Sequence, residues 1–151
     1  MRSLLALFLT FAVGACATAT PIDAQPRFAF VAIMVSDVDA SAAWYAQVFG
    51  LSEANRATSD TYDVRVLRSD EMLVELIELN PLPPAPPDRV LGISKAGFEI
   101  GDWDARLAAW RAQGVRFFND RVLFDESLQL HNVIIEDPDG NMIQVFGRAA
   151  P

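Results

Sequence analysis

Few residues of this chain could carry out acid–base, nucleophilic or metal chemistry. Its 151 residues include one histidine, His131, and one cysteine, Cys16. A zinc site needs several His or Cys ligands, so these residues cannot build a site of that kind. His131 is the only side chain that ordinarily titrates near neutrality, and it is therefore the one candidate general base. A single histidine in a strand is more often packed or exposed than catalytic, and both interpretations stay open at this point.

Successive side chains of a strand point to opposite faces, and in the predicted strands one face is uniformly apolar whereas the other is mixed. Val31, Ile33 and Val35 share one face, which suits contact with a helix. The opposite faces of the predicted strands are mostly apolar and carry a few polar groups. An apolar hollow with a small number of polar groups is the usual composition of a small-molecule site. These opposite faces give the predicted ligand-binding pocket: Phe30, Met34, Glu75, Lys95, Glu99, Gln144 and Phe146.

Lys95 needs a negative partner if it points into this pocket, because a buried ammonium group is costly unless it is paired. Glu75 and Glu99 lie on the matching face. We therefore predict an ion pair between Lys95 and Glu75. This pair either binds a polar ligand or only holds the two halves of the domain together.

The elements that must position these residues occur twice in the chain. Residues 30–40 align with residues 95–105, which lie 65 positions further on. In each copy an apolar strand runs into Asp-x-Asp, a pattern typical of a helix N-cap, and then into an amphipathic helix. Gly50 and Gly114 are predicted to end the two helices.

Three strand-like stretches follow each helix. Asp137–Gly140 predicts a hairpin turn before the last of them, because Pro138 presets φ and Gly140 permits a positive φ. Five prolines within residues 81–87 predict a stiff, extended connector between the copies. Since a half of about 60 residues buries too little surface to be stable alone, the halves must pack together. The predicted fold is therefore α+β, with two βαβββ modules forming a curved eight-stranded mixed sheet around a central cavity. The predicted strands span 51–57, 61–68, 72–78, 115–119, 128–136 and 141–146.

The first residues have the composition of an export signal. Arg2 precedes an uncharged apolar run over residues 4–15, which is shorter than the roughly 20 residues that cross a bilayer. Val13-Gly14-Ala15-Cys16 resembles the lipobox of bacterial lipoproteins, in which the cysteine is acylated. Ordinary cleavage after Ala17-Thr18-Ala19 is the alternative. Both interpretations predict an exported protein, in the bacterial periplasm or anchored to a membrane through Cys16.

The predicted domain boundaries and the net charge of the chain limit the kinds of molecule that it is expected to bind. We expect a signal peptide at 1–15, a tether at 16–27 and one domain at 28–147, with modules 28–79 and 92–147 joined by a Pro-rich linker at 80–91. The chain has 12 basic and 20 acidic residues, for a net charge of −8, so it lacks the basic footprint of nucleic-acid binding. Contact with a membrane is expected only through the lipid anchor. An exposed sheet edge or the open mouth of the fold would allow a homodimer, which the sequence does not decide.

The doubled βαβββ plan, Trp44-Tyr45, and Asp137-Pro138-Asp139-Gly140-Asn141 before the last strand resemble the vicinal oxygen chelate superfamily. That superfamily includes glyoxalase I, extradiol dioxygenases, and the fosfomycin and bleomycin resistance proteins. The resemblance covers about residues 28–147. For metal enzymes of the superfamily it implies ligands at the positions of Phe30, Glu75, Lys95 and Gln144. A phenyl ring and a lysine ammonium offer no lone pair, and the two remaining oxygen donors do not make a tight transition-metal site.

We therefore predict an exported protein that binds a small molecule with no cofactor and no catalysis, as the bleomycin resistance proteins do. The first alternative is a lyase, isomerase or dioxygenase that uses one divalent metal ion on Glu75, Gln144 and His131. The second alternative is a structural or partner-binding lipoprotein whose pocket is filled by side chains.

Overall fold

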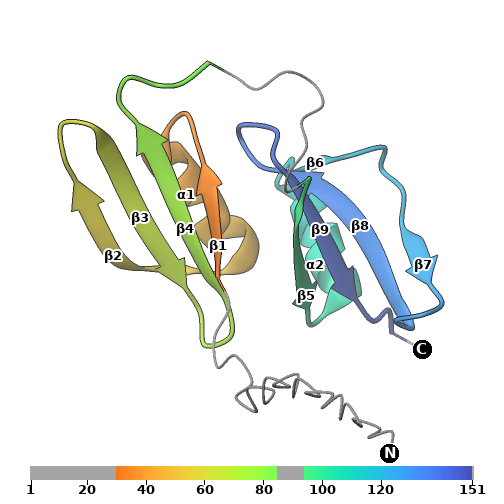
Figure 1. The fold of residues 1–151 in the computed structure, drawn as a ribbon. Coiled ribbons are helices and arrows are strands. Elements are labelled where there is room, and N and C mark those ends of the chain that lie inside the picture. The colour runs from red at the N-terminus through yellow and green to blue at the C-terminus, as the bar shows by residue number, and fades with distance from the viewer. Residues whose placement is uncertain (1–29, 85–93, 151) are drawn as a thin grey trace, which may run out of the picture.

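The computed structural model describes residues 30–84 and 94–150 as two βαβββ halves (Figure 1). The predicted signal peptide and tether, Cys16, and the linker beyond Pro84 lie outside the described residues. The first half contains β1 (Val31–Met34), α1 (Val38–Phe49), β2 (Ser52–Thr58), β3 (Tyr62–Arg68) and β4 (Leu73–Leu79). The second half contains β5 (Ala96–Ile100), α2 (Trp103–Ala112), β6 (Arg116–Phe117), β7 (Leu123–Asp125), β8 (Leu130–Glu136) and β9 (Met142–Gly147).

Each half forms its own sheet. The first has the order β1-β4-β3-β2 and the second the order β5-β9-β8-β6, with β7 also paired to β8. The first strand of each half runs parallel to the last one, β1 to β4 and β5 to β9. The predicted α+β class with its doubled module is confirmed. The strand count differs from the prediction by one, because the three residues of β7 pair with β8 in a segment with no predicted strand. In the described part of the chain, no ladder joins the two sheets.

The helices supply the apolar layer that makes the two sheets one core. Both helices lie on the same side of the sheets (Figure 1), and the core is one cluster of buried side chains from both halves. The predicted separation of strand faces holds: Ile33 of β1 is buried, whereas Met34 of β1 and Phe30, directly before the strand, are exposed. Among the described residues, no helix is long and apolar enough to span a membrane. Each helix buries one face, as an amphipathic helix does; the buried residues include Val38, Tyr45, Trp103, Leu107 and Trp110.

The two helices begin differently, although the repeat predicts the same N-cap for both. Asp37 caps α1, since its Oδ1 accepts a hydrogen bond from the backbone N of Ala40 at 2.9 Å. Asp102 stands before α2 with a φ of +49°, and its side chain makes no capping hydrogen bond. The predicted cap at Asp102 is therefore wrong, and α2 starts from an irregular turn at Gly101–Asp102. The predicted helix ends are confirmed, with Gly50 at φ +70° and Gly114 at φ +75°.

Candidate ligand-binding cleft

The two halves meet through their helices. Phe49 at the end of α1 lies 5.4 Å from the Phe98 ring of β5 and 5.8 Å from the Trp110 ring of α2, measured between ring centroids. The indole Nε1 of Trp110 donates to the backbone carbonyl of Val48 at 2.9 Å. Edge-to-face aromatic contacts and a buried hydrogen bond of this kind fix the angle between the halves.

The β8–β9 turn closes one end of this junction. The backbone N of Ser36 donates to Asp139 Oδ2 at 3.0 Å, and the Ser36 hydroxyl donates to the other carboxylate oxygen. Deeper in the same turn, the hydroxyl of Tyr45 on α1 donates to Oδ2 of Asp137 at 3.1 Å. Burial and the charge of Asp137 raise the pKa of the Tyr45 phenol well above its ordinary range. This turn therefore latches the second half onto the start of α1.

The equivalent end on the other side lacks this latch, because both the donor side chains and the turn differ. The residue directly after β8 is Asp137, whereas the residue directly after β3 is Ser69. At the 65-residue offset, Ser36 corresponds to Gly101, which has no hydroxyl to bind the β3–β4 turn. Tyr45 corresponds to Trp110, whose only polar side-chain atom already donates to Val48. Without the Ser36 and Tyr45 hydroxyls, and without a buried carboxylate like that of Asp137, the β3–β4 turn has no latch like that of its counterpart. The space between that turn and the Gly101 turn is the main cleft of the described residues.

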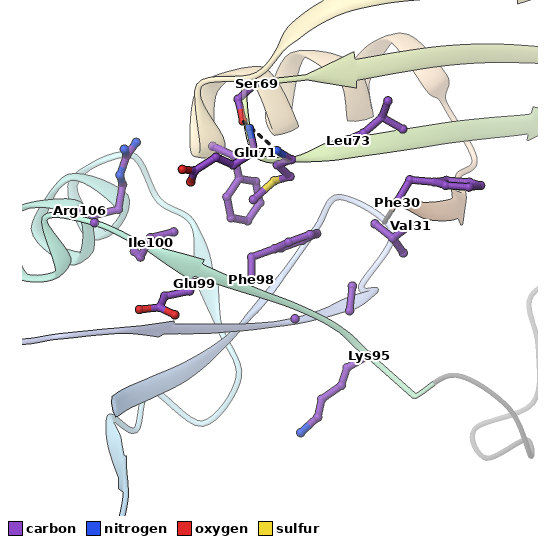
Figure 2. Close-up of a pocket in the computed structure, with 15 residues that line it drawn as sticks. Phe30, Val31, Ser69, Glu71, Leu73, Lys95, Phe98, Glu99, Ile100 and Arg106 are labelled. Carbon is purple, nitrogen blue, oxygen red and sulfur yellow. Dashed lines mark hydrogen bonds between the residues drawn. The ribbon is translucent and has the colours of Figure 1, made fainter. Parts of the chain in front are cut away.

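The cleft has a volume of about 540 Å³, within the range of small-molecule sites. Its walls come from the β3–β4 turn and the beginning of β4 on one side, and from β5 and the start of α2 on the other (Figure 2). The ring of Phe98 points between these walls in Figure 2. The apolar part of the lining consists of Phe30, Val31, Phe49, Met72, Leu73, Ala96, Phe98 and Ile100.

The polar groups of the cleft stand at its rim. Glu71 and Glu99 come from opposite walls (Figure 2) and both are exposed. Neither carboxylate has an ion-pair partner within 4.0 Å in the described parts of the chain. Arg106 of α2 adds a guanidinium group, whose Nη1 reaches the Val48 carbonyl at 3.5 Å. The Ser69 hydroxyl is used locally, where it accepts from the backbone N of Met72 at 3.2 Å.

Comparison with known proteins agrees with this architecture. Residues 27–145 match the Glyoxalase/Bleomycin resistance protein/Dioxygenase superfamily. The chain belongs to this superfamily. Its fold resembles the glyoxylase/bleomycin resistance protein/dioxygenase domain from Frankia sp. EAN1pec, with a TM-score of 0.70 and 17% identity over 83% of this chain and 94% of that one.

Two enzymes of the superfamily have similar folds. Lactoylglutathione lyase from Agrobacterium tumefaciens has a TM-score of 0.59 and 17% identity, over 82% of this chain and 96% of that one. The trypanothione-dependent glyoxalase I of Leishmania major has a TM-score of 0.63 and 20% identity, over 81% and 87%. No curated protein matches the sequence. At these identities the likeness extends to the fold alone.

The structure divides the predicted pocket residues into three groups. Phe30, Lys95 and Glu99 border the cleft, although the side chain of Lys95 points away from it in Figure 2. Met34 lines a smaller neighbouring hollow of about 250 Å³, which also touches Lys95. The remaining three predicted residues line neither space; they lie half-buried on the open face of the sheets, and are Glu75, Gln144 and Phe146.

The predicted ion pair between Lys95 and Glu75 is not formed. Lys95 is exposed, and its side chain points away from the cleft in Figure 2. Within residues 30–84 and 94–150, no carboxylate approaches its ammonium group within 4.0 Å. An ammonium group in water needs no fixed partner, so the physical premise of the pair, burial of Lys95, does not apply.

The residues at the superfamily's metal-ligand positions do not fit a metal ion. Phe30 has no donor atom, and the Lys95 ammonium is turned outward. The amide of Gln144 is used across the sheet, where Nε2 donates to Asn132 Oδ1 at 3.1 Å. In the described ranges, no group of three or more His, Cys, Asp or Glu side chains is arranged to hold a metal.

His131 lies on the helix-covered face of β8. Its ring centroid is 5.0 Å from that of Phe124 and 6.2 Å from that of Trp103 on α2. It does not line the cleft. The structure therefore favours the packing interpretation of His131 over the role of general base.

Sequence reasoning missed the residues that shape the cleft from the β3–β4 turn and the start of α2, namely Glu71, Gly101 and Arg106. The alternation of side chains between strand faces places the predicted pocket at the middle of the strands, where this alternation is most regular. The signal that could have located the cleft was present in the repeat, because Ser36 in one copy is replaced by Gly101 in the other.

Proposed function

We propose that this protein binds a small organic molecule in the cleft between the β3–β4 turn and β5, and that it does not transform that molecule. The observation that carries the proposal is the cleft itself, about 540 Å³ of space with an aromatic floor and charged groups at its rim. A ligand with an apolar body and polar ends matches this distribution, since the floor removes apolar surface from water while the rim orients the ends.

The lining supports binding better than catalysis. Acid–base catalysis needs a group that can exchange a proton near the operating pH, and nucleophilic catalysis needs an activated hydroxyl, thiol or amine. The cleft lining contains no imidazole and no thiol. Among the described residues, the side chains of Glu71, Glu99 and Arg106 make no hydrogen bond to a hydroxyl that they could activate. The one hydroxyl, of Ser69, stabilises its own turn.

The proposal is tested by filling the cleft. Gly101 lines it and has open space where a Cβ would lie, so Gly101→Trp adds an indole ring at the border of the cleft without a backbone clash. We expect the unmodified protein to bind the neutral fluorophore N-phenyl-1-naphthylamine at one saturable site. Gly101→Trp should weaken this binding by at least about tenfold, because the added ring competes for the space that the ligand would fill. Fluorescence titration measures both constants.

Ala57→Trp is the matched control. Ala57 lies on β2, is exposed and does not line the cleft, so the same ring added there should leave the titration unchanged. Equal affinities for Gly101→Trp and Ala57→Trp would refute the cleft as the binding site. Absence of saturable binding to the unmodified protein would refute the proposed ligand chemistry.

We also propose that the protein is exported and anchored by a lipid on Cys16. The support is the sequence Val13-Gly14-Ala15-Cys16 after an apolar run. In a bacterial host, Cys16→Ser is expected to abolish incorporation of labelled palmitate and to move the protein from the membrane pellet to the soluble periplasmic fraction. Unchanged fractionation of Cys16→Ser would overturn the lipid anchor and favour ordinary cleavage.

A further inference from the structure

The outer edge of the second sheet carries an apolar strand that has no covering element among the described residues. β7 pairs with β8 on one side, through Leu123 with Asn132 and Phe124 with His131. It is the outermost strand of its sheet in Figure 1, and no described strand pairs with its other side. Edge strands of soluble proteins are normally shielded by charged residues, proline or a covering loop, because their free N–H and C=O groups can pair with another strand.

This edge carries exposed apolar side chains where a soluble protein usually has charged residues or proline. Val122, Leu123 and Phe124 are 43%, 49% and 50% exposed. Leu128, in the turn that follows, is 51% exposed. Neighbouring large apolar side chains that remain in water on an unpaired edge mark an interaction surface.

The sequence of this edge is complementary to itself. Arg121 and Val122 lie directly before β7, and together with the strand they read Arg121-Val122-Leu123-Phe124-Asp125. This segment has a positive residue at one end, a negative one at the other and three apolar residues between them. If two copies pair antiparallel about Leu123, each Arg121 stands opposite Asp125 of the other copy and each Val122 stands opposite Phe124. Directly opposed residues of opposite charge, and apolar pairs, are the contacts that stabilise antiparallel strands.

The charges at the two ends are available for this pairing. Arg121 is exposed, and it has no ion-pair partner within 4.0 Å among the described residues. Asp125 accepts hydrogen bonds from Ser127 and Leu128, which hold its carboxylate at the end of the strand. The same bonds lower the pKa of Asp125, so it carries its charge at neutral pH.

We propose that two copies of this chain associate through β7, antiparallel and centred on Leu123, so that their second sheets join into one continuous sheet. A twofold axis through the Leu123 pair makes the contact isologous and closed, so it ends at the dimer. The edge is thereby covered by its own counterpart. The cleft lies at the opposite edge strand of this sheet, β5, so each copy keeps its own cleft open.

A single cysteine tests both the association and its register. In the full chain carrying Cys16→Ser, we introduce Leu123→Cys, so that the new thiol is the only one. Opposed residues of an antiparallel pair are close enough for a disulfide. Mild oxidation should therefore cross-link Leu123→Cys at least about fivefold more than Leu82→Cys, an equally exposed apolar position away from this edge. Cross-linking at or below the level of the Leu82→Cys control would overturn the proposal.

The charges give an independent test by sedimentation. Arg121→Asp places like charges at both ends of the pair and should raise the dimer dissociation constant by at least about tenfold. The double variant Arg121→Asp with Asp125→Arg restores opposite charges and should restore the dimer, with circular dichroism checking that the fold is kept. A monomer at all concentrations, or a dimer that neither Arg121→Asp nor Leu123→Cys affects, would refute pairing through β7. Neither result bears on ligand binding in the cleft.

Discussion

Replacing Asp137 by alanine is expected to lower the free energy of unfolding by about 4 kcal/mol, more than any other single substitution in the β8–β9 turn should cost. The Asp137 side chain is fully buried. Its carboxylate accepts hydrogen bonds from the backbone N of Asp139 and Asn141, from the Asn141 amide and from the Tyr45 hydroxyl. Alanine leaves these donors without an acceptor in a place that water does not reach, and each unsatisfied buried group costs about 1–3 kcal/mol.

Urea unfolding measures this change, with Asp139→Ala as the control in the same turn. Asp139 is exposed, and within the described ranges its carboxylate accepts hydrogen bonds from Ser36 alone, so its loss should cost about 1 kcal/mol or less. The loss in the free energy of unfolding for Asp137→Asn should fall between these two values. The asparagine amide keeps one acceptor oxygen, but its NH2 group is a donor placed against the donors of Tyr45 or Asn141. If Asp137→Ala and Asp139→Ala destabilise the protein equally, the buried carboxylate does not hold the two halves together.

The fold is well predicted from the sequence because the repeat constrains it twice. Each copy supplies the same order of elements, so an uncertain stretch in one half is checked by its counterpart in the other. The strand faces follow from alternation, which needs only local information. The element that the sequence does not predict, β7, has three residues and no alternation long enough to detect; it exists because β8 extends beyond β6 and offers free hydrogen-bonding groups.

The candidate site is harder to predict because it arises where the repeat is broken. Alternation places the pocket on the open faces of the strands, and three of its seven predicted residues line the cleft. The cleft lies where the latch has no counterpart: Gly101 and Trp110 stand in place of Ser36 and Tyr45, and Ser69 follows β3 where Asp137 follows β8. These residue differences matter only if the opposing turn lies within hydrogen-bonding distance, and that distance depends on how the two halves pack. Local patterns carry no information of this kind.

The stability of the protein is expected to fall as the pH rises above about 10, and Tyr45 is expected to be a principal cause. Burial, together with the charge of Asp137, raises the pKa of the Tyr45 phenol above its ordinary value of 10.0. The folded state therefore keeps this proton at a pH where the unfolded chain releases it. The stabilisation is fully present below pH 10 and is lost as the pH rises beyond it, at up to about 1.4 kcal/mol per pH unit.

Tyr45→Phe separates this contribution from general alkaline unfolding. The variant loses the hydrogen bond to Asp137, so near pH 8 it should be less stable than the unmodified protein by about 1–2 kcal/mol. Above pH 10 the two stabilities should converge, because phenylalanine has no proton to lose.

Tyr62→Phe is the control: Tyr62 is 40% exposed at the start of β3, and its removal should leave the pH dependence unchanged. Urea unfolding between pH 8 and pH 11 measures all three proteins. Parallel curves for the unmodified protein and Tyr45→Phe would mean that the Tyr45 phenol titrates in the folded state as it does in water, and that the latch at the β8–β9 turn is open to solvent.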